Sequence, residues 1–252
     1  MDYKNISKYS LLSNVQILEH LKAGSIYINP FNHRNLSTAS YDVRLGPNYF
    51  RLQKPDIGNE IYSMWDKDDI ARVWGKPKSA ELAEVAFKKI GKKIPKGIHP
   101  FDRVIFIPPK ETFLCHTLEF IGGRGIVTTD MNARSSTGRN CIQVCHCAGW
   151  GDVDYVNIWT MEVTNNHTDF IVPLVVGRRI AQIGFFELDS TEGKSYTTEG
   201  KYNTSKDIDS VIKNWTPYSM LPKKYMDWEI ELAKSEYKKL IDPDYYNNKI
   251  DI

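Results

Sequence analysis

The chain has 252 residues, of which 41% are hydrophobic and 12% are aromatic. This composition excludes a disordered chain, because the apolar side chains can form a sizeable core. The 33 Lys and Arg residues nearly balance the 31 Asp and Glu residues, so no overall basic field indicates a nucleic-acid partner. No apolar run approaches the roughly 18 residues that cross a membrane, and the polar N-terminus lacks a signal-peptide pattern. We expect no membrane or nucleic-acid partner, and a cytoplasmic location, or the host-cell cytoplasm for a viral protein.

The first 52 residues predict one helix followed by two strands. Residues 11–24 have apolar residues at helical spacing, with Ser13 as the expected N-cap and Gly24 at the end. The segments 25–31 and 40–52 alternate apolar and polar residues, which is typical of half-buried strands. The expected apolar face of the helix consists of Val15, Ile17, Leu18 and Leu21. In the second strand Tyr41, Val43 and Leu45 are expected to face away from Asp42 and Arg44.

Residues 53–100 interrupt this β pattern, and we interpret them as an insertion between strands. They are rich in lysine and carry two helical patterns, at 66–74 and at 79–90, the second with Ser79 as its expected N-cap. The Lys-rich stretch 88–96 is more typical of a solvated surface than of a binding patch. The apolar residues of the two helices are Ile70, Val73 and Trp74 in the first, and Leu82, Val85, Ala86 and Ile90 in the second.

From residue 101 to residue 188 the pattern predicts β-strands throughout. Short apolar or alternating segments are separated by turn residues, a spacing typical of a sandwich, jelly roll or small barrel. The predicted strands are residues 103–109, 112–121, 125–133, 141–148, 156–165, 170–176 and 181–188. The tail that follows predicts one more helix after Pro222, with Tyr225, Trp228, Leu232 and Leu240 at roughly helical spacing.

The strongest local signal for chemistry is the turn ARSSTGR at residues 133–139. Guanidinium groups and serine hydroxyls bind phosphate oxygens, and Gly138 lets the backbone approach a ligand closely. The candidate ligand-binding residues are Arg134, Ser135, Ser136 and Arg139. The alternative is an ordinary surface turn with solvated arginines.

A second signal is the pair of carboxylates Asp152 and Glu162, the latter within the predicted strand 156–165. A carboxylate on a largely apolar strand face is costly unless it is paired or functional. Partial burial would raise the pKa of Glu162 and suit it to proton transfer. The alternative is an exposed edge strand with Glu162 in water. Alternation puts Ile158, Thr160 and Glu162 on one face, and Asn157, Trp159, Met161 and Val163 on the other.

Three of the four cysteines, Cys141, Cys145 and Cys147, lie around His146. In a straight strand Cys145 and Cys147 share a face and His146 points away, so a tetrahedral zinc site would need a bend. The chain also lacks the H-x-E and P-C-x-x-C signature of zinc nucleobase deaminases. We therefore expect small buried thiols in a packed strand and no metal held by the protein itself.

Several of these segments, taken in their order along the chain, resemble the dCTP deaminase family, a branch of the dUTPase-like superfamily. The helix and strand at 11–31, TASYDVRLG at 38–46 and ARSSTGR at 133–139 resemble its N-terminal elements and its phosphate-binding turn. The matching later segments are Ala148 to Glu162 (nucleoside and catalytic segment), residues 172–188 (the next strand pair), and Tyr196 with Lys201-Tyr202 (the C-terminal segment that closes over the nucleotide).

The resemblance implies a mainly β fold, a distorted β-barrel or jelly roll of the dUTPase-like type, with an N-terminal helix. The helical insertion and the C-terminal helical tail are additions that the apolar pattern predicts. We therefore assign residues 1–205, including the inserted segment 53–100, to a deaminase domain, and residues 206–252 to a C-terminal extension. The resemblance also implies a homotrimer with active sites between subunits. Mg²⁺ would be bound through the nucleotide triphosphate rather than by a protein cage.

The activity that the resemblance implies is zinc-independent hydrolytic deamination of dCTP to dUTP and ammonia. Glu162 would be the general acid and base, and Ser135 and Arg139 would assist it. The substrate-binding roles would fall to Arg134 and Ser136 (triphosphate), Asp152 (deoxyribose 3′-hydroxyl), the backbone near Ala148 (attacking water), the backbone of Thr160 and Met161 (base edge), and Tyr196 and Lys201 (closing segment).

Three other functions stay open at this point. A bifunctional enzyme would also cleave the product to dUMP and pyrophosphate. A dUTP pyrophosphatase would lack deamination, although a carboxylate at Glu162 argues against it. A catalytically silent nucleotide-binding module would use the insertion and tail for regulation. The chain departs from the family pattern in its long insertion, in Gly149-Trp150 before Asp152, in Ser205 where the family has Gln, and in its tail.

Overall fold

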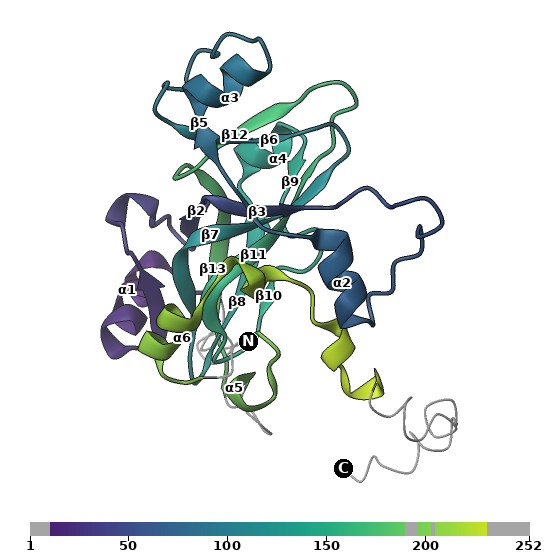
Figure 1. Cartoon of the computed structure of the whole chain (residues 1–252). Helices are drawn as coiled ribbons and strands as arrows, with labels where there is room; N and C mark the ends of the chain where they lie inside the picture. Colours follow the sequence, from purple (N-terminus) through teal and green to yellow (C-terminus); the bar gives the residue numbers. More distant parts are fainter. Residues whose placement is uncertain (1–10, 190–195, 203–204, 231–252) are drawn as a thin grey trace, which may run out of the picture. The chain divides into compact units, whose positions relative to one another are not determined.

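A computed structural model describes residues 11–189, 196–202 and 205–230 (Figure 1). The chain divides into two compact units. The main unit comprises the described residues of Met1–Leu52 and Lys76–Met220, and the second unit those of Gln53–Gly75 and Leu221–Ile252. The predicted division of the chain at residue 205 stays a prediction.

The largest sheet of the main unit has six antiparallel strands. Its central pair is β7 (Thr112–Gly123) and β11 (Val156–Asn165), which places Glu162 opposite Leu114. The sheet order is β4-β3-β7-β11-β9, and β1 also pairs with β7. The remaining strands are β1 (Ile26–Asn29), β3 (Asn48–Arg51), β4 (Lys78–Ser79) and β9 (Ile142–Gln143).

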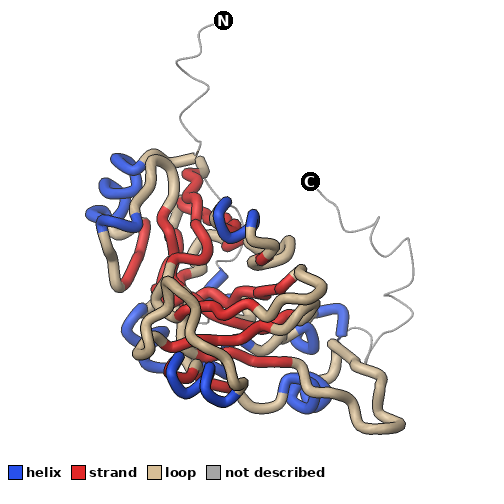
Figure 2. The backbone as a smooth tube through the Cα atoms, turned by 90° about the horizontal axis from the view of Figure 1, so that it is seen from above, coloured by secondary structure: helices blue, strands red, loops and turns tan. Residues whose placement is uncertain are grey.

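Two smaller antiparallel sheets complete the main unit, in the orders β10-β8-β13-β2 and β12-β6-β5. In Figure 2 the strands, drawn in red, lie side by side. The predicted mainly β fold is therefore confirmed. The strands are β2 (Tyr41–Arg44), β8 (Val127–Ala133), β10 (Trp150–Gly151), β13 (Arg179–Glu187), β5 (Glu81–Leu82), β6 (Arg103–Ile107) and β12 (Val172–Val175).

The core of the main unit draws large side chains from both of the larger sheets. Tyr41, Phe113, Met161 and Phe185 are each at most 1% exposed and belong to one cluster. Burying each such side chain contributes about 1.5–3 kcal/mol to folding. The strand that carries Glu162 is thus fixed in place by its inward-facing neighbours.

Helix α1 (Asn14–Ala23) confirms the first predicted element. Ser13 and Gln16 form a reciprocal capping box, and Gly24 ends the helix in the left-handed conformation with φ 81°. Ile17 is fully buried, but Val15 is 62% exposed. The predicted apolar face is therefore narrower than expected, because the helix packs on the core through one stripe around Ile17.

The predicted strand 40–52 is two strands in two different sheets, β2 and β3. The chain changes sheets at Gly46, whose N–H donates to His116 O at 2.7 Å and where a Cβ would lie 2.1 Å from the His116 ring. Only glycine permits this approach. Asp42, expected to face outward, is 2% exposed, because two arginines neutralise it.

In the second unit, helix α2 (Lys67–Trp74) confirms the first helix predicted in the insertion. The Asp66 carboxylate caps it by accepting from the N–H groups of Asp68 and Asp69. Ile70 and Trp74 are buried, as predicted.

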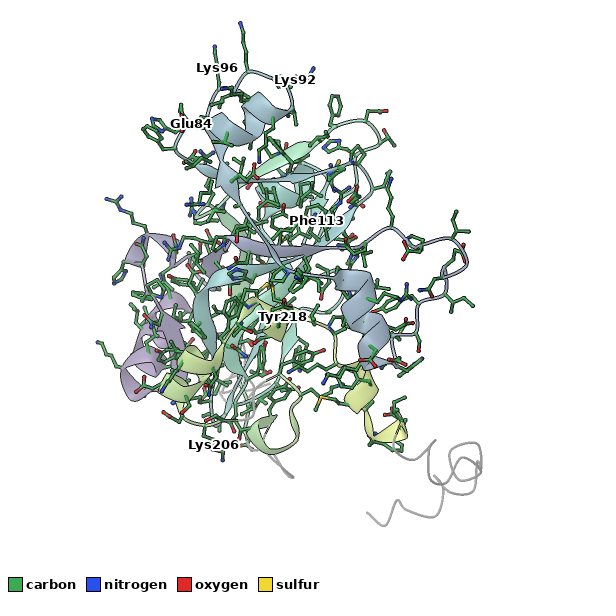
Figure 3. All side chains as sticks on the ribbon, in the orientation of Figure 1. Glu84, Lys92, Lys96, Phe113, Lys206 and Tyr218 are labelled. Atoms are coloured by element: carbon green, nitrogen blue, oxygen red, sulfur yellow. The ribbon has the colours of Figure 1, made fainter. Side chains whose placement is uncertain are left out.

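In the main unit, helix α3 (Ala83–Lys89) begins later than predicted. Ser79 does not cap it; Ser79 lies in β4 and pairs with Asn48 of β3. Leu82 lies in β5. Val85 and Ile90, expected on the apolar face, are 41% and 45% exposed. The helix instead buries Ala83, Ala86 and Phe87 against Val104 of β6. Figure 3 shows Lys92 and Lys96 pointing outward at this end, as expected for a solvated basic loop.

The tail begins with α6 (Ile208–Asn214), which the apolar pattern did not predict. Of the helix predicted after Pro222, residues 228–230 are helical, whereas Leu232 and Leu240 lie outside the described residues. No helix among the described residues has both the length and the apolar character to cross a membrane. Short 3₁₀ helices are η2 (His33–Asn35), η3 (Pro217–Met220) and η4 (Lys224–Met226).

A buried ion pair joins β2 to β7. Arg44 Nε donates to Glu119 Oε1 at 2.6 Å, and the Arg44 backbone N–H donates to Oε2 at 3.0 Å. The Glu119 side chain is 0% exposed, and Arg44 compensates its charge. Removing one partner of a buried pair leaves an uncompensated charge in the interior.

We predict that Arg44→Ala lowers the free energy of unfolding by about 3–5 kcal/mol. The control is Lys89→Ala, which breaks the exposed pair with Glu81 and should cost less than about 1 kcal/mol. Urea unfolding followed by tryptophan fluorescence measures both. Equal losses in the two variants would contradict the importance of the buried pair.

Candidate active site

The candidate site lies along one edge of β11. On one side β11 pairs with β7 from Val156 to Thr164. On the other side β9 pairs only with its last two residues, Thr164 and Asn165. Among the described residues, no other backbone group bonds this second edge between residues 158 and 163. The edge around Thr160 and Met161 is therefore open for pairing with a ligand, such as the edge of a base.

Glu162 lies in the middle of β11. Its side chain is half-buried, and Oε2 is shielded from solvent without a hydrogen-bond partner among the described residues. Burial raises the pKa of Glu162, whereas its own backbone N–H and the charge of His146 oppose the rise. The structure favours the functional interpretation over a carboxylate in open water, because a partly desolvated carboxyl can accept or donate a proton.

Residues 144–148 form a turn, so the predicted strand 141–148 is wrong beyond β9. Cys145 and His146 have positive φ values of 64° and 40°, which end an extended strand. The Ala148 N–H donates to Cys145 O at 2.6 Å and closes the turn. The chain turns here because it passes from β9, beside β11, to β10, beside β8.

The cysteines consequently differ from the expected row of buried thiols. Cys145 is buried and its Sγ donates to Met131 Sδ at 3.2 Å, but Cys141 and Cys147 are exposed. Burial raises the pKa of the Cys145 thiol, with smaller contributions from Glu162 and Asp130. These carboxylates therefore lie near the turn.

Two glycines hold the segment after the turn against β8. A Cβ at Gly149 would lie 2.1 Å from Met131 O, and a Cβ at Gly151 would lie 2.4 Å from Thr129 Oγ1. The Met131 N–H donates to Gly149 O at 2.7 Å. Glycine at positions 149 and 151 is thus required by this close packing.

Asp152 and Tyr196 both lie near the start of β11. Asp152 is exposed and accepts a hydrogen bond from Trp150 Nε1 at 3.2 Å. Tyr196, in α5 (Tyr196–Glu199), packs edge-on against Tyr155 with ring centroids 5.2 Å apart. Burial raises the pKa of Tyr196 to about 12, and Asp152 adds to the rise. Burial also raises the pKa of Tyr155, with a smaller contribution from Glu162, so these groups share one neighbourhood.

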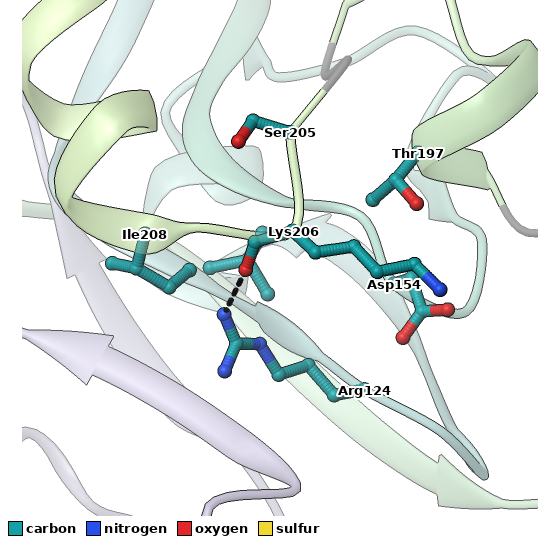
Figure 4. A pocket seen from close by; sticks show the side chains of 7 residues that line it. Arg124, Asp154, Thr197, Ser205, Lys206 and Ile208 are labelled. Carbon is teal, nitrogen blue, oxygen red and sulfur yellow. Dashed lines mark hydrogen bonds between the residues drawn. The ribbon is translucent and has the colours of Figure 1, made fainter.

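The segment after α5 lies against the start of β11. Asn157 Nδ2 donates to Tyr202 O at 2.9 Å. Arg124 Nη2 donates to Lys206 O at 3.0 Å beside a hollow of about 180 Å³ (Figure 4). Ser205 lines this hollow and a second one of about 170 Å³. Neither hollow is lined by Glu162, so Ser205 contributes to the docking of the tail rather than to the surroundings of the carboxylate.

The predicted phosphate-binding turn is a single helical turn, α4 (Ser135–Arg139), between β8 and β9. Ser135, Ser136 and Arg139 are all exposed. Helix α4 packs against β9, which pairs with the end of β11. Its hydroxyl and guanidinium groups are therefore accessible to a ligand close to the strand that carries Glu162.

Arg134 points elsewhere, toward β2. Its Nε lies 3.0 Å from Asp42 Oδ2 in an ion pair, and Arg179 Nη1 donates to the same oxygen at 3.0 Å. The Asp42 side chain is 4% exposed and both arginines are partly exposed. Asp42 therefore fixes the residue that immediately precedes α4.

The structure brings together part of the predicted set. Tyr196 packs against Tyr155, whose N–H donates to Asp152 O at 3.0 Å, and Lys201 is half-buried in the closing segment. The charge of Glu162 also acts on Tyr155. No described contact joins Ser135 or Arg139 to Glu162. The sequence reasoning missed three members: Tyr155, which resembled an ordinary core aromatic; Asp42, whose place in an alternating pattern indicated exposure; and His146, which was considered only as a zinc ligand.

A metal site built by the protein has no support among the described residues. No group of three His, Cys, Asp or Glu side chains lies close enough to hold an ion. The expectation that Mg²⁺ binds through phosphate oxygens, and that zinc has no role, stays a prediction.

Comparisons with known proteins identify the family. The model of the dCTP deaminase-like family matches residues 11–188. A dUMP-forming dCTP deaminase of Aquifex aeolicus (strain VF5) is 27% identical over 198 residues, covering 79% of this chain and 92% of the relative. The corresponding protein of Bifidobacterium longum (strain DJO10A) is 30% identical over 190 residues, covering 75% and 86%.

Solved structures give weaker matches. The dCTP deaminase of Agrobacterium tumefaciens has a TM-score of 0.49 and 15% identity, and the match covers 76% of this chain but about half (52%) of that chain. The dUTPase of EIAV has a TM-score of 0.31 and 20% identity over 36% of this chain and 74% of its own.

A family match that spans most of the β fold, together with a carboxylate on an open strand edge, defines the class of protein. The chain belongs to the dCTP deaminase-like family, and the predicted membership is confirmed.

We predict that Glu162→Gln makes the protein more stable above neutral pH. A carboxyl whose pKa is raised by folding stabilises the native state below its unfolded pKa, near pH 4, and that contribution is lost as pH rises through the folded-state pKa. The amide in Glu162→Gln stays neutral at every pH, so the stability of the variant does not fall in this way as the pH rises.

Urea unfolding of both proteins at pH 4 and pH 8 tests this prediction. The difference in unfolding free energy should be near zero at pH 4 and should favour Glu162→Gln at pH 8. Glu84→Gln, at an exposed carboxylate, should change stability by less than about 0.5 kcal/mol at both pH values. A variant less stable than the parent at pH 8 would contradict the prediction.

Proposed function

We propose that this protein deaminates dCTP with water and then hydrolyses the product to dUMP and pyrophosphate. The observation that carries the proposal is the half-buried carboxyl of Glu162, with one oxygen that has no partner among the described residues, beside an open strand edge. The dUMP-forming relatives support the second step.

Deamination requires water to attack C4 of the cytosine ring and the amino group to leave as ammonia. Glu162 takes a proton from the water and returns it to the ring nitrogen or to the leaving amine. Such general acid–base catalysis contributes about 10²–10⁴ in rate. The raised pKa of Glu162 suits it to both roles, and positioning and electrostatics supply the rest.

The neighbouring groups position the water and the base. The Ala148 N–H is used within the turn, so its carbonyl is the group that accepts from the attacking water, together with the Ser135 hydroxyl. The backbone of Thr160 and Met161 pairs with the base along the open edge of β11. Arg139 stabilises the charge that develops during attack.

The rest of the nucleotide binds at the ends of the site. Ser136 and Arg139 hold the triphosphate, and Arg134, fixed by Asp42, contributes from the start of α4. Asp152 accepts a hydrogen bond from the deoxyribose 3′-hydroxyl. Tyr196 and Lys201, from the closing segment, make the remaining contacts with the nucleotide.

Mg²⁺ enters the site on the triphosphate, because no cluster of carboxylates among the described residues would hold it alone. When bound, it would neutralise phosphate charge. Ser136 and Arg139 would hold the oxygens of the triphosphate that carries it.

We propose that the protein works as a homotrimer with sites between subunits. Ser135 and Arg139 are exposed, and no described contact links them to Glu162 within one chain. A neighbouring subunit that closes this gap would complete the site. The substrate is a free nucleotide, and neither a membrane nor a nucleic acid takes part.

The direct test is to incubate the full chain with dCTP and Mg²⁺ and to follow ammonia, pyrophosphate and nucleotides. We predict equal amounts of ammonia, pyrophosphate and dUMP with little free dUTP. Glu162→Gln should reduce ammonia release by at least about 10²-fold while dCTP binding stays within about tenfold. Glu84→Gln serves as the control and should retain full turnover.

Other outcomes identify the alternatives. Ammonia without pyrophosphate would indicate a deaminase that releases dUTP. Pyrophosphate from dUTP without ammonia from dCTP would indicate a dUTP pyrophosphatase, and binding without turnover a regulatory module. Full turnover by Glu162→Gln would remove this residue from the mechanism.

A further inference from the structure

A hydrogen bond ties His146 to the strand that carries Glu162. Its Nε2 lies 2.8 Å from Thr164 Oγ1, which lies 2.7 Å from Thr112 Oγ1 on β7. Thr164 is 7% exposed and, two residues after Glu162 on β11, is on the same face of the strand. The anchor of the imidazole is therefore a buried hydroxyl pair beside the carboxylate.

The backbone of the turn supports the same placement. Cys145 and His146 are consecutive non-glycine residues with positive φ, a conformation that costs about 1–2 kcal/mol per residue. Such conformations persist where the surroundings enforce them. Here Cys145 is buried against Met131 and the Ala148 N–H closes the turn, so His146 is presented to β11 by a fixed backbone.

The other titratable groups near Glu162 do not supply a positive charge. Cys145 from the same turn and Tyr155 before β11 both interact with Glu162, and burial raises the pKa of each, which keeps them neutral near pH 7. Asp130 on β8 acts on Cys145. Among the described residues, His146 is the basic side chain whose charge acts to lower the pKa of Glu162.

We propose that His146 is a positioning residue for proton transfer at Glu162: anchored on Thr164, its imidazolium holds the carboxyl in the ionised form that accepts a proton from water. The inference rests on the proposed role of Glu162. A positive charge near the carboxyl favours its ionised form, so the effect extends activity toward acidic pH, where Glu162 would otherwise become protonated.

The test compares the pH profile of kcat/KM for dCTP in the full chain and three variants. His146→Asn removes the charge with a residue that tolerates positive φ, and His146→Arg keeps a charge. His33→Gln, at an exposed histidine on η2, is the control. We expect the acidic limb to move upward by about half a pH unit or more in His146→Asn, and to stay near the parent in His146→Arg and His33→Gln.

A second readout does not depend on the reaction. The ¹³C signal of the Glu162 carboxyl, assigned by its absence in Glu162→Gln, should titrate at higher pH in His146→Asn than in the parent. The same titration pH in both proteins would overturn the inference, as would an acidic limb that does not move. A shifted titration in a protein that does not deaminate dCTP would uphold His146 and refute the proposed function.

Discussion

The arrangement depends on one costly feature, a carboxyl group half-buried on the central strand pair of the main sheet. An oxygen of Glu162 is shielded from solvent and has no partner among the described residues, and a group of this kind destabilises a fold when ionised. The β7–β11 pair tolerates it because Met161 and Val163, its neighbours along the strand, are fully buried in the core. The same core fixes where the carboxyl points.

The chain connectivity explains how the candidate groups come close. From β8 the chain forms α4, then β9 on the end of β11, then the turn at Cys145 and His146, and returns to β8 through β10 before it enters β11. The segment between β8 and β11 therefore carries three candidate features: the exposed hydroxyls of α4, the turn at Cys145 and His146, and Asp152. Close packing of Gly149 and Gly151 against β8 fixes the position of this segment.

Much of this was predictable from local patterns. The N-cap at Ser13 and the strand around Glu162 follow from spacing and composition, and the ordered motifs identified the family. The sequence left open whether the Glu162 carboxyl is partly buried or lies in water. What failed depended on distant contacts. The strand 40–52 breaks at Gly46 because the His116 ring leaves no room for a side chain. Asp42 is buried because Arg134 and Arg179, far along the chain, neutralise it. The alternation of apolar and polar residues along one strand predicts neither the break at Gly46 nor the burial of Asp42.

The most direct measurement is a crystal structure of the Glu162→Gln variant with dCTP and Mg²⁺. The account predicts that C4 of the base lies beside the amide at position 162, that the base edge pairs with the backbone at Thr160 and Met161, and that the phosphates lie at α4. A nucleotide bound with its base away from β11, for example in the hollow at Arg124 and Lys206, would contradict it.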